Sequence, residues 1–337
     1  MIVNRKLLVD QLSMVLPATG TGPEGSSRVV FENNALSAYN GHIAIEVPCS
    51  MKDIACSVNA SELTTILRRF DTAECDISLT EDKFIIKAGK AKASLKLFPI
   101  VHSSCLFLDR PTGIPFPSDY HDALATCHIP GNKHLLAGAF FSGTGAVSTD
   151  GMRINHVTLS EDTNKFWIND TAIKTILKYG NVFTQYAITD GHVWFRNDEL
   201  VIAVNRLNDE LYKIDKVKAY VETCKDVDTV YIPEGLYAVV QRSAPFTETE
   251  QSLQPIQLSF LPTGIYVAVD TAHGAYEEMV EFEDELPVAE ETVRVDYAHL
   301  LYALKRSNAI GIKHIGDDRM LVLVSETGIV MLGTLGG

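Results

Sequence analysis

Hydrophobic residues recur at helical spacing in three segments of the chain, 59–71, 169–181 and 296–308. In each segment apolar side chains occupy positions i, i+3 and i+4, which gives a helix one buried face. Each segment also opens with a preferred N-cap residue, Asn or Asp. The pattern therefore predicts three related helices. Their apolar residues are Leu63, Ile66 and Leu67, then Ile173, Ile176 and Leu177, and then Leu300, Ala303 and Leu304.

Strand patterns surround these helices. Alternating apolar and polar residues with turn-forming interruptions follow each helix, which predicts antiparallel meanders of short strands. A second set of strand patterns comes before each helix, and a further helical stretch precedes each of those sets. The meanders are expected at 75–98, 184–207 and 310–335, the earlier strands at 28–47, 138–157 and 256–280, and the further helices at 5–16, 120–127 and 233–244.

The order helix, strands, helix, strands repeats three times along the chain. The first two N-caps, Asn59 and Asn169, lie 110 residues apart, and so do the turns that begin at Asn40 and Asp150. This repetition predicts an α+β protein of three similar domains, 1–109, 110–222 and 223–337. Each domain is expected to hold a single antiparallel sheet with two helices on one face. Linkers are expected near 109–113 and 218–228.

Charge changes this picture in one respect. The 337 residues include 29 Lys and Arg against 43 Asp and Glu, a net charge of −14, so the average surface repels nucleic acid. Residues 277–291 hold eight acids and no base, and are expected to form a solvated acidic loop. The helices nevertheless present bases at the same place in each repeat. Bases near helix C-termini commonly just complement the helix dipole, but a threefold recurrence favours a basic face with a purpose. The recurring bases are Arg68, Lys178 and Lys305, with Arg69, Lys174 and Arg306 on the same helices, and the first helices of the repeats add Arg5, Lys6 and Arg242.

The sequence offers little to a catalytic interpretation. Six cysteines without a Cys-x-x-Cys pair indicate a reduced, cytoplasmic protein with buried thiols, and no metal or cofactor is expected. No phosphate-binding loop, Gly-x-Ser-x-Gly elbow or His-Glu-x-x-His motif is present. No signal peptide or membrane span is expected either. A hydrolase or nuclease assembled from distant residues stays open as an alternative.

Three passages resemble the bacterial-type DNA polymerase sliding clamp, the β subunit of DNA polymerase III. They are residues 59–98, the central AVSTDGMRINHV at 146–157, and VDYAHLLYALKRS at 295–307 with the strand pair that follows. The resemblance implies a non-catalytic protein of three domains, two copies of which close head-to-tail into a ring. Sheets form the outside of that ring, and the basic helices line a hole that holds duplex DNA. Its implied partners are DNA polymerase and an ATP-driven clamp loader, and its implied place is the nucleoid.

The resemblance also implies two contact sites. A partner-peptide pocket would use Thr149, Gly151, Met152, Arg153 and Ile154, together with Ile329 and Met331 from the last strand. Met152 stands where the family commonly has His, and the chain end lacks the family's usual Pro and Arg. The interface between subunits would include Leu106, Phe107 and Leu108. The departures leave two interpretations open, a divergent clamp of phage origin or a regulator that binds clamp partners without encircling DNA.

Overall fold

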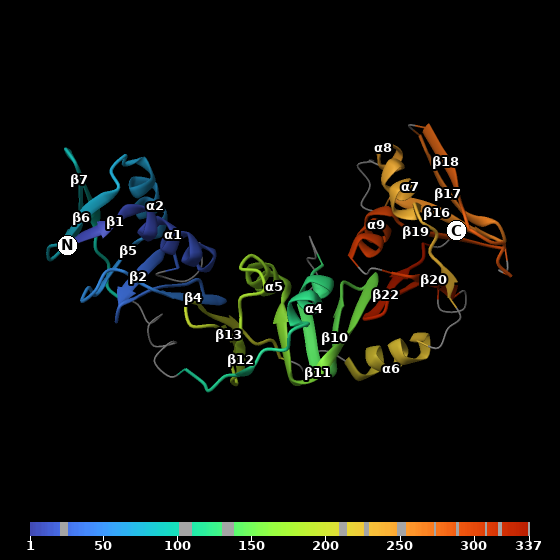
Figure 1. Cartoon of the computed structure of the whole chain (residues 1–337), viewed down its shortest axis with the longest axis horizontal. Coiled ribbons are helices and arrows are strands. Elements are labelled where there is room, and N and C mark those ends of the chain that lie inside the picture. Colours follow the sequence, from blue (N-terminus) through green and yellow to red (C-terminus); the bar gives the residue numbers. More distant parts are fainter. Residues whose placement is uncertain are drawn as a thin grey trace. The chain divides into compact units, whose positions relative to one another are not determined.

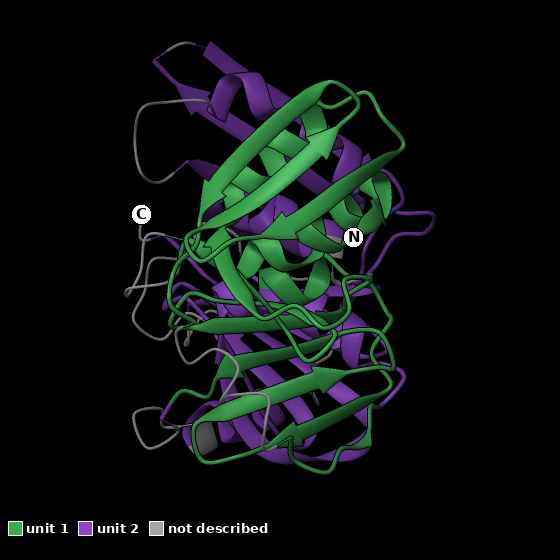
Figure 2. Ribbon diagram, turned by 90° about the vertical axis from the view of Figure 1, so that its left-hand side faces the viewer, with its two compact units in different colours: residues 1–116, 174–207 green, residues 117–173, 208–337 purple. Residues whose placement is uncertain are grey.

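The computed structural model describes residues 1–20, 26–100, 110–129, 138–208, 214–225, 229–247, 254–272, 274–287, 290–306, 309–315 and 319–335. The chain forms two compact units, which Figure 2 distinguishes by colour. The first unit contains residues 1–116 and 174–207, and the second contains 117–173 and 208–337. Within the described residues, no helix has the length and apolar character needed to cross a membrane.

The first unit has two antiparallel sheets, of four strands in the order β1-β6-β7-β8 and of eight in the order β5-β2-β3-β4-β14-β13-β12-β9. Helices α1 and α2 pack against each other beside these sheets (Figure 1). The elements are β1 (Ile2–Asn4), α1 (Arg5–Val15), η1 (Leu16–Ala18), β2 (Arg28–Glu32), β3 (Ala35–Tyr39), β4 (Ile43–Pro48), β5 (Cys56–Asn59), α2 (Ala60–Arg69), β6 (Glu74–Leu79), β7 (Lys83–Ala88), β8 (Ala91–Lys96), β9 (Ile114–Pro115), β12 (Gln185–Ile188), β13 (His192–Arg196) and β14 (Val201–Asn205).

The second unit also has two antiparallel sheets, of six strands in the order β10-β11-β22-β21-β20-β15 and of four in the order β18-β17-β16-β19. Helix α5 (Asp170–Leu177) begins in this unit and ends in the other. The remaining elements are α4 (Tyr120–Cys127), β10 (Gly138–Thr149), β11 (Arg153–Asn169), α6 (Ile214–Lys225), β15 (Val230–Tyr231), α7 (Leu236–Arg242), α8 (Ala244–Thr247), β16 (Pro255–Leu261), β17 (Gly264–Thr271), β18 (Gly274–Glu281), β19 (Glu291–Asp296), α9 (Tyr297–Arg306), β20 (Gly311–Ile315), β21 (Met320–Val324) and β22 (Gly328–Gly333).

The N-caps that open the three related helices are confirmed. The Asn59 side chain accepts a hydrogen bond from the Glu62 amide at 3.0 Å. Asn169 accepts from the Ala172 amide at 2.7 Å, and Asp296 from the His299 amide at 3.0 Å. Each bond satisfies one of the free amides of a first helical turn, which stabilises a helix by about 1 kcal/mol. The three helices therefore begin as their sequences predict.

The expectation of one sheet in each repeat is wrong. Each repeat divides its strands between two sheets, and the sheets continue from one repeat into the next. Strand β4 pairs with β14, and β11 pairs with β22, in both cases antiparallel. These junctions satisfy the backbone groups of edge strands that would otherwise be open. Residue periodicity reports which face of a strand is buried, and it does not report which strand lies beside it.

The linker expected near 218–228 is also wrong, because most of it belongs to helix α6. Val217, Tyr220, Val221 and Cys224 follow the helical spacing i, i+3, i+4 and i+7. Val221 and Cys224 are fully buried, and the other two are partly buried against the same apolar cluster. Helix α6 is therefore an amphipathic helix that covers an apolar surface.

Helices α7 and α9 lie between the two sheets of the second unit. Their apolar side chains, among them Val240 and Leu300, share one buried cluster with residues from both sheets, such as Val267 and Leu323. The two helices also pack against each other. The main core of this unit is therefore a helix pair covered on both sides by sheet.

Candidate functional site

The sequence Thr-Asp-Gly-Met-Arg forms the turn between β10 and β11. One carboxylate oxygen of Asp150 accepts hydrogen bonds from the amides of Met152 and Arg153, at 3.0 and 2.9 Å. The Thr149 hydroxyl accepts from the Gly151 amide at 3.1 Å and donates to the Arg153 carbonyl at 2.7 Å. Gly151 has a φ of +89°, a conformation that glycine adopts without strain. The motif thus specifies a tight turn that presents Met152, whose exposed fraction is 37%.

Arg153 is held inside this turn. Its Nε donates to the second carboxylate oxygen of Asp150 at 2.8 Å, and only 5% of its side chain is exposed. Its guanidinium lies 4.9 Å from the centre of the Tyr302 ring on α9. The Tyr302 hydroxyl in turn donates to the backbone carbonyl of His128 at the end of α4. Arg153 therefore ties the turn to α9 and is already paired with a carboxylate.

His299 lies beside this pair. Its Nε2 is 3.8 Å from the Asp150 carboxylate. Burial lowers the pKa of His299, and the nearby Arg153 cation lowers it further, whereas Asp296 and Asp150 act in the opposite direction. The folded protein therefore favours the neutral imidazole.

We expect this histidine to make the protein less stable in mild acid. Below the ordinary histidine pKa of about 6.5 the unfolded chain binds a proton at residue 299 that the folded chain resists, so stability falls as the pH drops through that value. Urea unfolding at pH 7.5 and 5.5 should show a smaller pH dependence for His299→Gln than for the wild type. An unchanged pH dependence would contradict the assignment. His192, whose pKa is also lowered by burial, should keep some dependence in the variant.

Five of the seven residues predicted for the peptide pocket do line one cavity. It has a volume of about 490 Å³, within the range of small-ligand and peptide sites. Tyr220 of α6 and Met320 of β21 form its apolar wall, and residues near the end of β22 close it. The lining consists of Thr149, Gly151, Met152, Arg153, Ile154, Tyr220, Met320, Gly333 and Thr334.

The other two predicted residues, Ile329 and Met331, do not line this cavity. They are 3% and 0% exposed, in a cluster covered by Val221 and Cys224 of α6. Met331 nevertheless lies directly opposite Ile154 in the β11–β22 ladder. The prediction that they line the pocket overlooked helix α6, which covers them.

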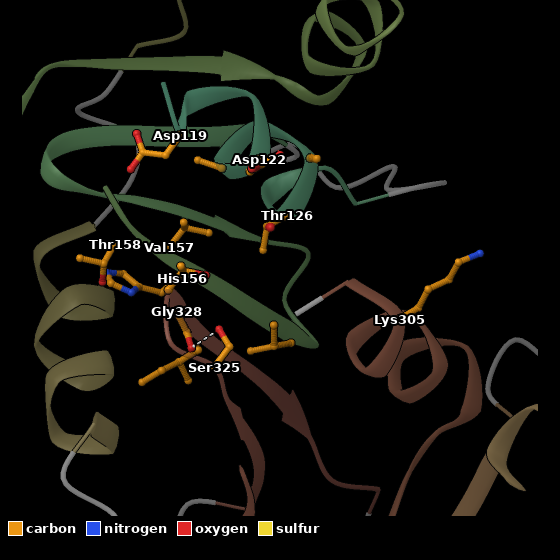
Figure 3. A pocket seen from close by; sticks show the side chains of 14 residues that line it. Asp119, Asp122, Thr126, His156, Val157, Thr158, Lys305, Ser325 and Gly328 are labelled. Carbon is orange, nitrogen blue, oxygen red and sulfur yellow. Dashed lines mark hydrogen bonds between the residues drawn. The ribbon is translucent and has the colours of Figure 1, made fainter. Parts of the chain in front are cut away.

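A second cavity, of about 350 Å³, lies between α4, β11 and the β21–β22 turn. Its lining includes Asp119, His156 and Ser325, and Ser325 donates a hydrogen bond to the Gly328 carbonyl at 3.1 Å (Figure 3). Lys305 of α9 also borders it, and Figure 3 shows this side chain extended away from the other labelled residues. Its ammonium group is therefore available to solvent rather than committed to the cavity.

The predicted basic residues fall into two groups. Lys6, Arg68, Arg69, Lys174, Lys178 and Lys305 are exposed. Arg5, by contrast, donates to the backbone carbonyls of Thr72 and Leu67, where it caps the end of α2. Arg242 is paired with Glu278 through two hydrogen bonds. Both side chains form hydrogen bonds to other parts of the folded chain, which removes the support for the prediction that they face DNA.

Some predicted residues cannot be placed. Leu106, Phe107 and Leu108 lie outside the described residues, and so does the side chain of Arg306. Cys105 lies there too, while the five described cysteines are buried and form no disulfide with one another. In the described part of the chain, no three His, Cys, Asp or Glu side chains gather in a way that could hold a metal ion.

No family model and no curated protein matches this sequence. Solved structures do match it over its full length. The β chain of DNA polymerase III from Streptococcus pneumoniae has a TM-score of 0.81 and 14% identity, covering 100% of this chain and 99% of that one. The DNA polymerase sliding clamp from Bacillus subtilis has a TM-score of 0.80 and 16% identity, with 100% and 98% covered. The chain has the sliding-clamp fold.

The Helicobacter pylori β clamp, crystallised with 3,4-difluorobenzamide, agrees with a TM-score of 0.77, 12% identity and complete coverage of both chains. TM-scores of 0.77–0.81 show the fold, whereas identities of 12–16% do not carry residue roles across, so those roles rest on the geometry of this chain. The sliding-clamp fold accounts for the threefold repeat of helices and sheets. It also accounts for the sheet junctions between successive repeats.

Proposed function

We propose that this protein is a DNA polymerase processivity factor, a sliding clamp that encircles duplex DNA as a homodimeric ring in the cytoplasm. The observation that carries the proposal is the recurrence of an exposed base nine residues after the N-cap of each of the three related helices, in a chain of net charge −14. Its domains are those predicted, 1–109, 110–222 and 223–337. The protein itself catalyses nothing, and a clamp-loader ATPase opens the ring.

The exposed bases suit a contact that must slide. Lysine and arginine on helix surfaces attract phosphates without reading bases, and the attraction is screened by salt. The acidic remainder of the surface repels DNA, so the duplex is favoured only along the basic helices. Polymerase would be held through the cavity beside Met152, where apolar walls from Tyr220 and Met320 suit an apolar peptide.

Removing one base from each repeat should weaken DNA binding. We expect Arg68→Ala, Lys178→Ala and Lys305→Ala, combined in one chain, to lower the affinity for a short duplex. The slope of log K against log salt should shrink by about 0.9 for each phosphate that the variant no longer neutralises. Fluorescence anisotropy between 50 and 300 mM KCl measures both. The control replaces three other exposed bases, Lys52, Lys87 and Lys216. Equal affinities for the two variants would contradict the proposal that the bases of these helices hold DNA.

The ring interface follows from the sheet junctions inside the chain. In the described part of the chain, β8 ends one four-stranded sheet and β18 ends the other. By repeat position β18 corresponds to β4 and β11, and β8 corresponds to β14 and β22. Because β4 pairs with β14 and β11 with β22, the third junction of this kind would join β18 to β8 of a second copy.

The register of that third junction can be derived. At the internal junctions Glu46 lies opposite Val201, and His156 lies opposite Ile329. Glu46 and His156 each pair with the residue nine positions earlier in their own hairpin, as Glu277 does with Ala268.

The other side of the junction follows the same logic. Val201 and Ile329 each pair with the residue five positions earlier, as Lys92 does with Lys87. Glu277 of one copy should therefore lie opposite Lys92 of the other.

The two edges carry opposite charge. Lys90 and Lys92 are exposed at β8, and Glu277 and Glu281 are exposed on β18. Residues 277–281, expected to lie in a solvated loop, are thus part of a strand. Opposite charges across an antiparallel pair contribute about 0.2–1 kcal/mol each and set the register. Leu106, Phe107 and Leu108 stay predicted contacts of the same interface.

A further inference from the structure

Strands β21 and β22 are apolar on both faces. Val330 and Leu332 point into the main core of the second unit, while Ile329, Met331 and Val322 join a separate cluster on the opposite face. The corresponding strands of the first repeat, β7 and β8, are exposed on that opposite face. They carry Lys83, Lys87, Lys92 and Lys96 there. The third repeat therefore has an apolar surface that the first repeat lacks.

Helix α6 covers this surface. Figure 1 shows it on the side of the sheet away from α9. Val217, Tyr220, Val221 and Cys224 form its apolar face, with Val221 and Cys224 fully buried against the strands. The Lys218 ammonium donates to the backbone carbonyl of Ser142 at 2.7 Å, which fixes the helix across β10.

The covered surface is continuous with the cavity beside Met152. Ile154 and Tyr220 belong both to the cavity lining and to the cluster beneath α6. Met320 belongs to both as well. A ligand that enters the cavity therefore reaches the edge of α6 first.

We propose that the surface beneath α6 is a peptide-binding site that α6 fills in this structure, and that a partner segment binds there by taking its place. The partner is an amphipathic segment with apolar residues at i, i+3, i+4 and i+7, the pattern of α6 itself. This inference rests on the proposed function, since the segment would belong to the tethered polymerase. Ile329 and Met331 then line the open site, as their sequence position predicts.

The length of α6 and the separate cluster that it covers suit a helix that can detach from the sheet. A helix of 12 residues is marginal by itself in water, so its folding depends on the surface it covers. That surface is a satellite cluster separate from the main core. Its exposure leaves the main core closed. The helix lowers the apparent affinity of a partner by the fraction of time that the site is filled.

The test uses a fluorescent peptide with the sequence of residues 214–225, acetylated and amidated, and the full-length chain. In the wild type the site is filled, so binding of the peptide should be weak. Val221→Asp in the chain puts a carboxylate against Met331 and detaches its own α6. We expect the peptide to bind this chain at least about tenfold more tightly than the wild type.

Three controls identify the site. A peptide that carries Val221→Asp should not bind. A chain that combines Val221→Asp with Ile329→Asp should lose binding, because the surface itself is altered. Lys216→Asp, on the exposed face of α6, should leave peptide binding as weak as it is in the wild type.

Equal peptide binding by the wild type and a folded Val221→Asp chain would overturn the proposal. Hydrogen exchange on the wild type gives a second test that needs no variant. The α6 amides should exchange at least about tenfold faster than those of β22, because the helix opens alone. Equal protection would also overturn it. Neither test involves DNA, so a chain that binds the peptide but does not hold DNA would lose the proposed function and keep this site.

Discussion

Replacing Glu277 and Glu281 with lysine should convert the dimer into a monomer. Both carboxylates are exposed on β18, and in the derived register Glu277 lies opposite Lys92 of the second copy. The substitutions place like charges across both junctions of the ring. Like charges in register cost several kcal/mol, so the dimer dissociation constant should rise at least about 100-fold. Light scattering across a dilution series should then report 37.1 kDa, the mass of one chain.

The complementary variant gives the sharper test of the register. Lys90→Glu and Lys92→Glu should also yield a monomer. An equal mixture of the two variants should restore the dimer, because every junction of a mixed ring pairs lysine with glutamate. The control is Asp198→Lys with Glu199→Lys, which changes the net charge equally at an exposed turn and should leave the dimer intact. Variants that stay dimeric alone, or fail to associate when mixed, would contradict this interface.

Replacing Arg153 with methionine should cost about 3 kcal/mol of stability. Arg153 and Asp150 form an ion pair whose side chains are only 5% and 12% exposed. The substitution removes the cation and leaves the carboxylate largely desolvated and unpaired. It also removes the contact with the Tyr302 ring, worth about 1 kcal/mol. Urea unfolding of the full chain, monitored by a signal from the second unit, measures the loss in free energy of unfolding.

A double-mutant cycle separates the ion pair from the packing. Asp150→Asn keeps a side-chain oxygen for the turn but leaves the buried Arg153 cation without its opposite charge, and should also cost about 3 kcal/mol. The double variant should be more stable than the sum of the single changes predicts, by about 1–2 kcal/mol. Arg69→Met, at an exposed position, should change stability by less than about 0.5 kcal/mol. Full additivity, or an Arg153→Met chain as stable as the wild type, would show that the pair does not hold the turn.

Features set by local interactions could be predicted from the sequence. The caps at Asn59, Asn169 and Asp296 act within three residues, and all three bonds are formed. The turn at Gly151 likewise follows from its own residues, because Asp150 and Thr149 supply its hydrogen bonds. The threefold repeat could be predicted for the same reason, because each copy carries its own cap and its own apolar helix face.

Features set by contacts between residues far apart in the chain could not be predicted from the sequence. Nothing near Arg5 indicates that its side chain caps the end of α2, and nothing near Arg242 indicates that it pairs with Glu278. The sheet junctions join strands far apart in the chain. The cover over Met331 did leave a signal, because β22 is apolar at four consecutive positions, as a strand buried on both faces is. Paired with the helical spacing at 217–224, that run predicts α6.

The central claim is that the protein holds DNA by surrounding it, and topological retention tests this most directly. Protein is threaded onto a linear duplex with one end on a bead, the free end is then blocked with a bulky cap, and unbound protein is washed away in 0.5 M salt. The ring account predicts that protein stays on the capped duplex and is released when a restriction enzyme cuts beside the cap. Release from capped and uncapped DNA at the same rate would contradict the ring. That result would favour a regulator that binds clamp partners without encircling DNA.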